Sequence, residues 1–312
     1  MPEVVSTKAR FFNKIAVVIV LLLTVVYLIP LYWIGSTAFK PRSAATTVPP
    51  TVFFKPELTP FVKLFTKRVQ LRKVVSQEKY DAAAWYEKLV YDAGERIITN
   101  SPFLNRFWNS IIIAGISTIL ALTLGTFTAY GFSRFKLAGE NDWLFFILST
   151  RMLPPVVVAI PIFLMFRTIG LVDSHAGLIL LYTALNLSFC VWLMKGFMDE
   201  IPVEYEEAAL VDGYTRFEAF WKIVLPQSAT GIAATAVFSF ITAWNEYALA
   251  LMMTNRKAQT APPFIPSQLG SGMVDWTTIA AGTFIFLFPV AIFTFILRKH
   301  LLRGVTFGAI RK

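Results

Sequence analysis

The segment that decides the fold is IPVEYEEAALVDGYTRFEAFWKIVLP, residues 201–226, a charged stretch between apolar segments long enough to span a bilayer. Pro202 suits the first turn of a helix, where its missing N–H costs nothing, and the glutamates that follow lie near the positive end of the helix dipole. Gly213 suits the left-handed residue that ends a helix. The sequence therefore predicts a short helix followed by a sharp bend.

A second short helix is predicted directly after the bend. Thr215 and Glu218 have the spacing of a capping box, in which a threonine hydroxyl and a glutamate satisfy the first N–H groups. Apolar residues then recur at positions i, i+3, i+4 and i+7, and Pro226 is expected to end the helix. These residues form one predicted apolar stripe: Phe217, Phe220, Trp221 and Val224. Both helices are expected to lie along a membrane face with the apolar side inward.

The same segment carries a motif of about seven specified positions over some twenty residues, which is far more specific than a lone short motif. Its positions are Glu207, Ala208, Ala209, Gly213, Ile223, Leu225 and Pro226. The motif resembles the EAA loop of permease subunits of bacterial ATP-binding cassette importers. The resemblance implies that this loop is a coupling helix that docks into a groove on a separate cytoplasmic ATPase. The implied coupling residues are Glu207, Ala208, Ala209, Asp212, Gly213, Leu225 and Pro226.

The chemistry of these residues agrees with docking. Ala208 and Ala209 are small enough to let a partner approach closely, and Glu207 offers a carboxylate to a cationic residue. Gly213 permits the bend. The alternative is an amphipathic connector that has no partner.

Composition places the chain among polytopic membrane proteins. Hydrophobic residues make up 56% of the chain and charged residues 15%, outside the range of soluble domains. The net charge of +10 comes from residues that flank apolar spans, so it indicates membrane topology and not nucleic-acid binding. The chain has no phosphate-binding GxxxxGK[ST] loop, and its two histidines have no partners at metal-ligand spacing. We therefore expect no catalytic residues, no cofactor and no metal.

Six stretches approach the roughly twenty apolar residues that cross a bilayer, which predicts an all-α bundle of six transmembrane helices. They cover residues 14–36, 107–132, 142–167, 175–195, 226–254 and 276–297. The expected domains are a cytoplasmic N-terminus (1–13), a first span (14–36), an external loop (37–106) and a permease core (107–312). The core includes the EAA loop (200–226) and a cytoplasmic tail (298–312).

Orientation follows from basic residues in short flanking segments. With six spans, the basic residues of the N-terminus, of the connector Arg134–Lys136 and of the tail all fall on one face. That face is expected to be cytoplasmic, with the protein in the bacterial inner membrane and both termini inside. The first loop is also basic, but at about seventy residues its charge should weigh little, because long loops translocate regardless of charge.

The first external loop is proline-rich at its start and then becomes helical in character, from Asp81 to Tyr91. The part from about residue 66 to 99 resembles an insertion. Two interpretations stay open: contact with an external solute-binding protein, or a small helix packed on the permease.

Small residues recur every four positions in two predicted spans, and such spacing lets helix backbones approach closely in lipid. They are Ala121, Gly125 and Ala129 in the second span, and Gly231, Thr235, Ser239 and Ala243 in the fifth. The pattern predicts helix packing, either within the chain or against a second permease.

Two charged residues lie within predicted spans, where an arginine costs about 2.5 to 3.5 kcal/mol. Arg151 precedes Pro154 and Pro155, which should break the third span where it faces protein or a watery cavity. The alternative is that Arg151 snorkels to the cytoplasmic interface. A direct pair with Glu246 is not favoured, because Arg151 lies at a shallower depth.

Glu246 lies in the segment Trp244-Asn245-Glu246-Tyr247, which suits a sugar because hydroxyls bond to carboxylates and sugar faces stack on aromatic rings. The alternative is a structural Asn–Glu pair that holds helices together. Asn186 could similarly join two helices. The candidate pathway residues are Arg151, Asn186, Trp244, Asn245, Glu246 and Tyr247.

Nearly the whole chain outside the external insertion resembles the carbohydrate-uptake permeases, the smaller maltose-type subunit in particular. The residues that carry this resemblance are 151–155, 244–247 and 302–312. It implies a second permease subunit, a cytoplasmic ATPase dimer and an external solute-binding protein as partners. Oligosaccharides, glycosides, polyols and sugar derivatives stay open as the solute. The alternative is an ion-coupled secondary transporter or channel, which would have no reason to carry an EAA loop.

Overall fold

The computed structural model describes residues 7–268 and 274–309, and only the backbone of 7–13, 268 and 300–309. The expected cytoplasmic ends therefore lie partly outside the described residues. The chain divides into two compact units. Unit 1 comprises the residues up to Ser101 and residues 268–285, which include the start of the last helix. Unit 2 holds Pro102–Ser267 and the chain from Phe286 onward.

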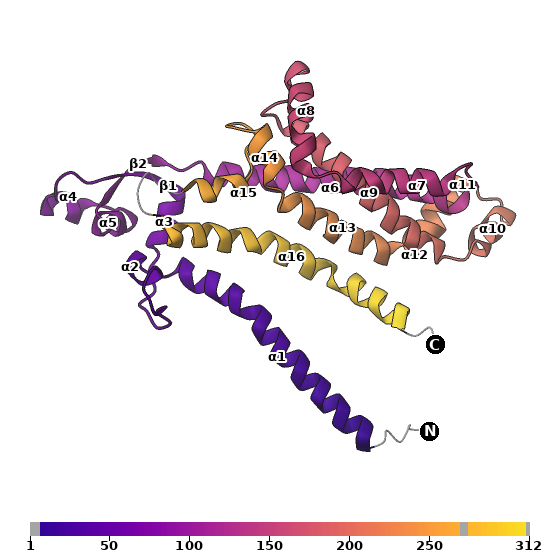
Figure 1. Cartoon of the computed structure of the whole chain (residues 1–312), viewed down its shortest axis with the longest axis horizontal. Helices are drawn as coiled ribbons and strands as arrows, with labels where there is room; N and C mark the ends of the chain where they lie inside the picture. The colour runs from indigo at the N-terminus through magenta and orange to yellow at the C-terminus, as the bar shows by residue number, and fades with distance from the viewer. Residues whose placement is uncertain (1–6, 269–273, 310–312) are drawn as a thin grey trace. The chain divides into compact units, whose positions relative to one another are not determined.

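Unit 1 combines one long apolar helix with a small fold of short helices and two strands (Figure 1). Its elements are α1 Thr7–Ala38, α2 Arg42–Ala45, α3 Thr59–Phe65, β1 Thr66–Gln70, α4 Gln77–Ala82, α5 Trp85–Asp92, β2 Glu95–Asn100 and the first turns of α16 Trp276–Ala309. Strands β1 and β2 pair antiparallel, from Thr66 opposite Asn100 to Gln70 opposite Glu95. The expected helices are present, but the strand pair was not predicted, since both strands carry polar side chains on both faces and lack an apolar alternation.

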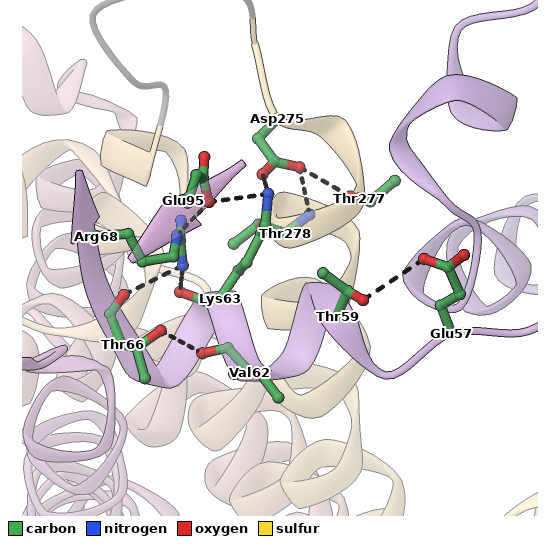
Figure 2. Close-up of polar contacts among 10 residues, drawn as sticks. All are labelled: Glu57, Thr59, Val62, Lys63, Thr66, Arg68, Glu95, Asp275, Thr277 and Thr278. Atoms are coloured by element: carbon green, nitrogen blue, oxygen red, sulfur yellow. Dashed lines mark hydrogen bonds and ion pairs between the residues drawn. The ribbon is translucent and has the colours of Figure 1, made fainter. Parts of the chain in front are cut away.

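Lys63 ties the small fold of unit 1 to the start of α16 (Figure 2). Its ammonium lies 3.0 Å from a carboxylate oxygen of Glu95 on β2 and 3.9 Å from one of Asp275. Asp275 in turn accepts hydrogen bonds from the hydroxyl of Thr277 at 2.8 Å and the N–H of Thr278 at 3.1 Å. It therefore caps the N-terminus of α16 with its carboxylate.

Among its described residues, unit 2 contains helices joined by loops and no strand. Its elements are α6 Phe103–Arg134, α7 Glu140–Ser149, the 3₁₀ turn η1 Thr150–Met152, α8 Pro155–Thr168, α9 His175–Asp199, α10 Glu204–Val211, α11 Arg216–Ala219, the π-helical turn η2 Phe220–Val224, α12 Leu225–Gln227, α13 Ala229–Trp244, α14 Ala248–Met253, α15 Ala261–Phe264 and the rest of α16, with the 3₁₀ turn η3 Pro266–Gln268 after α15. Helices α6, α9 and α13 lie side by side and enclose its core (Figure 1).

The small residues of α6 and α13 pack against α9, as predicted. Gly125 is buried, and a Cβ atom at this position would lie 2.5 Å from the Cβ of Cys190 in α9. At Gly231 in α13 a Cβ atom would lie 2.4 Å from the ring of Phe197. At Gly125 and Gly231 the missing side chain therefore allows close packing against α9, which agrees with the first of the two predicted alternatives, packing within the chain.

Four described helices are long and apolar enough to cross a membrane, and up to six spans result if each of two bent pairs counts as one. The first, second, fourth and sixth predicted spans each lie on one of these long helices. The third predicted span is broken, as expected at Pro154, and α7 with η1 meets α8 at 91°.

The fifth span differs from the expected continuous helix of residues 226–254. Helix α13 ends at Trp244, and α14 starts at Ala248. At its other end, α13 meets the preceding helix at 72°. The interruption has a local cause, because the carboxylate of Glu246 accepts hydrogen bonds from the N–H groups of Leu249 and Ala250 and so begins a new helix.

Candidate functional site

The elbow formed by residues 201–227 has the bend and the cap that the sequence predicts. Gly213 follows α10 with a φ of 87°, the left-handed conformation that glycine adopts without cost. The N–H of Glu218 donates to the hydroxyl of Thr215 at 3.3 Å, and the N–H of Thr215 donates to the carboxylate of Glu218 at 2.9 Å. The capping box therefore starts the second helix of the elbow at Arg216.

The predicted single apolar stripe of this second helix was wrong. Phe220 is buried at 2% exposure and Val224 is fully buried, but Phe217 is 64% exposed and Trp221 also faces outward. The π-helical turn from Phe220 to Val224 changes the angular spacing of the side chains, so the four residues do not share one face. The helix also continues through Pro226 to Gln227 instead of ending at the proline.

A buried ion pair fixes the elbow to the end of α6. The guanidinium of Arg134 contacts the carboxylate of Glu206 in α10, and both side chains are almost completely buried, at 4% and 6% exposure. The hydroxyl of Tyr130 donates to the same carboxylate at 2.8 Å, and Arg134 also donates to the carbonyl of Ile201 at 3.0 Å. With these additional hydrogen bonds, the buried charges are compensated. From the sequence, Arg134 was assigned only to membrane topology and Glu206 only to the helix dipole, and their ion pair was not predicted.

A second cluster of polar residues, near Arg134 in the sequence, joins the ends of α6, α7 and α9. The hydroxyl of Ser133 donates to Asp199 at 2.5 Å. The ammonium of Lys195 lies 2.8 Å from Asp199 and 3.3 Å from Glu140. These contacts join the three helices at the end of the bundle that carries the elbow.

The outer face of the elbow is exposed and partly apolar. Val211 is 88% exposed, and the other exposed large apolar residues of the elbow are Val203, Tyr205, Tyr214, Phe217 and Trp221. Among the predicted coupling residues, those exposed are Glu207, Ala208, Asp212, Gly213 and Pro226. An exposed cluster of this kind, with acidic residues among it, is typical of a protein-binding surface.

Ala209 and Leu225 were expected to contact the ATPase, but the structure places both against the chain's own fold. Ala209 is buried and points into the chain's own fold, so its small side chain lets α10 approach the bundle and not a partner. Leu225 is half-buried and packs against the cluster that contains Phe220 and Val224. These two residues support the elbow from behind.

Glu246 has a structural position. One carboxylate oxygen accepts the N–H of Leu249 at 3.0 Å, and the other accepts the N–H of Ala250 at 2.9 Å and the hydroxyl of Tyr182 at 3.0 Å. The carboxylate thus joins α14 to α9, which agrees with the alternative in which it holds helices together. Its structural partner is Tyr182, however, because Asn245 donates to the carbonyl of Ile241.

Trp244 cannot serve as an exposed platform for a sugar in this structure. Its side chain is 1% exposed and stacks on Phe286 and Phe240 with ring centroids 4.5 and 5.5 Å away. Its indole N–H donates to the carbonyl of Phe286. Tyr247, in contrast, is exposed.

Arg151 lies against aromatic rings inside unit 2. Its guanidinium carbon is 4.9 Å from the ring centroid of Phe189, which packs at 4.4 Å on Phe238. Within the described residues the guanidinium has no carboxylate partner, and one of its nitrogens is buried without a hydrogen bond. Asn186, one turn away from Phe189 on α9, donates to the carbonyl of Tyr182, while its side-chain oxygen is buried and unbonded. Both residues therefore retain hydrogen-bonding capacity inside the bundle.

Asp173, which the sequence did not single out, fixes a loop of unit 2. Its carboxylate accepts hydrogen bonds from the N–H groups of residues 255–258 at 3.1 to 3.2 Å. Burial by itself would raise the pKa of Asp173, but these N–H groups outweigh burial and lower it below its ordinary value of 3.8. The described residues contain no group of three or more potential metal ligands.

Comparison with known proteins agrees with the fold and the motif. Residues 121–307 match the family described as binding-protein-dependent transport system inner membrane component. The chain is 34% identical over 226 residues to the trehalose transport system permease protein SugB of Mycobacterium tuberculosis, which covers 72% of this chain and 82% of that protein. It is 31% identical to the sulfoquinovosyl glycerol transport system permease protein SmoH of Agrobacterium fabrum, over 68% of this chain and 75% of that protein.

Among solved structures, the fold resembles a chain of a bacterial ABC transporter involved in the import of the acidic polysaccharide alginate. The TM-score is 0.66 at 19% identity, and the match covers 95% of this chain and 98% of that chain. The chain is a multi-pass protein of the inner membrane. It belongs to the family of inner membrane components of binding-protein-dependent transport systems.

Proposed function

We propose that this chain is the permease subunit of an ATP-driven importer that takes up a carbohydrate delivered by a solute-binding protein. Family membership supports the dependence on a binding protein, and the two relatives above, named for trehalose and sulfoquinovosyl glycerol transport, support a carbohydrate as the solute. The subunit itself is non-catalytic, and ATP hydrolysis takes place on a separate chain. Membership in this family also argues against an ion-coupled secondary transporter.

The observation that carries the proposal is the two-sided elbow. Its inner side is fixed to α6 through the buried pair of Arg134 and Glu206, while its outer side presents exposed apolar and acidic residues. A partner that moves the elbow would therefore move α6, and would also move α13 through the 72° bend. Switching of a bundle between two openings by such rigid-body movement is a common mechanism in transport.

In this proposal, Glu207, Ala208, Asp212 and Gly213 contact the ATPase together with exposed apolar neighbours such as Val211. Ala209 and Leu225 shape the elbow from behind, and Pro226 is exposed at its end. The elbow and both termini lie in the cytoplasm, supported by the basic residues that flank the spans on this side. In this proposal a second permease subunit completes the pathway, as in the maltose-type permeases that the sequence resembles.

For the pathway, we place Arg151 and Asn186 closest to the solute, because each has a buried polar atom without a partner. Asn245 and Tyr247 are exposed at the break between α13 and α14 and can contact the solute there. Glu246 and Trp244 hold this region in place.

The test is reconstitution of the complex with its ATPase and binding protein, followed by Val211→Asp in the elbow. A charge in an apolar contact should strongly reduce ATPase recruitment and solute uptake. Val74→Asp in unit 1, where the valine is 97% exposed, is the matched control and should leave both unchanged. Unchanged recruitment and uptake in Val211→Asp would overturn the proposal. Thermal-shift screening of the binding protein with a sugar panel identifies the solute. If no carbohydrate stabilised the binding protein, the proposal that the solute is a carbohydrate would be refuted.

A further inference from the structure

Unit 1 contains a cavity of about 720 Å³ at the ends of two candidate membrane-spanning helices. Lys40 lies two residues beyond the end of α1, and Thr277 lies in the first turn of α16. The remaining wall comes from α2, the segment 55–58, α3, α5 with Trp85, and Ala93. Both spanning helices leave the apolar layer of the membrane here, so the cavity lies at the level of the lipid headgroups.

The cavity contains a buried ammonium group, that of Lys40, which forms no ion pair within the described chain. Lys63 also lines it, but its ammonium is compensated by Glu95 and Asp275 (Figure 2). Lys40 is only 1% exposed, and no carboxylate of the described residues lies within 4.0 Å of its ammonium.

The surroundings of Lys40 are aromatic. Its ammonium lies 4.0 Å from the ring centroid of Trp33 and 5.3 Å from that of Phe54. Such π faces stabilise a cation only in part. Lys55 also lines the cavity, as do the acidic residues Glu57 and Asp92, neither of which forms an ion pair with Lys40. The group that would compensate the ammonium of Lys40 is therefore an anion.

A second cavity, of about 430 Å³, is lined by residues of α1, α2 and α16 and by Thr46. Helix α2 lines both cavities, with Arg42 and Ser43 at the first and Ala45 at the second. The second cavity is mostly apolar, and its lining residues on α1 and α16 are Trp33, Ile34, Thr37, Trp276, Ile279, Ala280 and Thr283. Trp33 therefore touches the ammonium of Lys40 on one side and the apolar cavity on the other. Tryptophans at such positions are typical of the membrane interface.

We propose that unit 1 binds an anionic phospholipid, with the phosphate at Lys40 and an acyl chain in the cavity between α1 and α16. A water-soluble anion would use the cationic cavity alone and leave the apolar one without a role. A phospholipid fills both, because its charged and apolar parts have the same order along the membrane normal as the two cavities. Basic pockets between transmembrane helices recognise lipid headgroups in this way. The proposal does not depend on the transported solute or on which side the termini lie.

The test measures lipid retained by the intact, delipidated transporter, using native mass spectrometry after addition of phosphatidylglycerol. Lys40→Met keeps the aliphatic stem but removes the charge, and should lower the affinity of this site about fivefold, the contribution of one basic residue near a membrane surface. Lys40→Arg should retain the lipid. Lys79→Met, at an exposed lysine of α4 outside the cavity, is the control with the same charge change and should bind like the wild type. Thr46→Trp should also lower binding by filling the apolar cavity.

Equal phosphatidylglycerol retention in Lys40→Met and wild type would overturn the proposal. It would also fail if phosphatidylcholine with the same chains bound the wild type equally well. Displacement by soluble glycerophosphoglycerol at the lipid's own concentration would show that a water-soluble anion occupies the cavity. Should Lys40→Met not assemble, the two-lipid comparison on the wild type and the Thr46→Trp variant decide the question. Because lipid is measured without transport, these outcomes are separate from those that test the proposed function.

Discussion

Arg134 in the last turn of α6 and Glu206 in α10 form an ion pair that is almost completely buried. The next residue, Glu207, faces outward. Two adjacent glutamates of the same motif therefore have opposite positions: one holds the elbow to its own chain, and the other is free to meet a partner.

Replacement of Glu206 by glutamine should destabilise unit 2. It leaves Arg134 as a buried charge without a carboxylate, which costs about 3–5 kcal/mol. Thermal unfolding of the purified chain should begin at a lower temperature, and the elbow should exchange its amide hydrogens faster. An unfolding temperature equal to that of the wild type would show that the pair is not needed.

Replacement of Glu207 by glutamine should leave the unfolding temperature unchanged, since the side chain is exposed, but weaken ATPase binding through loss of a charge. Co-purification of the ATPase at rising salt concentration measures the effect. The pair of variants is matched in chemistry and differs only in burial, so a stability loss in Glu207→Gln would contradict the assignment.

Gly125→Val should destabilise the contact between α6 and α9, because its Cβ would lie 2.5 Å from the Cβ of Cys190. Overpacking of this kind costs about 1–3 kcal/mol. Gly115→Val in the same helix is the control, since a Cβ there has no atom within 4 Å. Thermal unfolding of both variants checks the prediction, and equal stability would refute close backbone packing at Gly125.

Glu246→Gln should lower stability and leave the solute dependence of uptake unchanged. The amide cannot accept all three hydrogen bonds that the carboxylate receives, and each bond to a charged group contributes about 1.5–3 kcal/mol. Uptake measured against solute concentration should show a lower maximal rate with the same half-saturation. A selective rise in half-saturation, with unchanged stability, would instead make Glu246 a solute contact.

The loop of residues 255–258 should lose its protection from amide hydrogen exchange only in acid. The pKa of Asp173 is lowered on folding below 3.8, so its stabilising contribution is fully present above that value and is lost as the pH falls through the folded-state pKa. Hydrogen exchange of the loop, corrected for intrinsic rates, should be constant between about pH 5 and 8 and increase below about pH 4. Asp173→Asn should weaken protection of the loop from hydrogen exchange already at neutral pH. If the loop exchanged as in the wild type, the hydrogen bonds of Asp173 would not hold it.

Local signals predicted the local structure well. The bend at Gly213 and the capping box at Thr215 depend on the conformations and side chains of a few neighbouring residues, so they could be derived from the chain alone. The break at Pro154 is equally local, because proline lacks the N–H that the helix needs. The apolar stripe from Phe217 to Val224 failed because the π-helical turn depends on packing beneath it.

By itself, the sequence determined that the chain spans the membrane several times and carries an elbow with a defined bend and cap, because these follow from hydrophobic length and local hydrogen bonds. Only the tertiary structure decided that Glu206 is buried and Glu207 exposed, and that Trp244 and Glu246 hold helices together. Side chains one position apart on a helix point in different directions, and only the neighbouring helix, α6 for the elbow, determines which of them is removed from solvent.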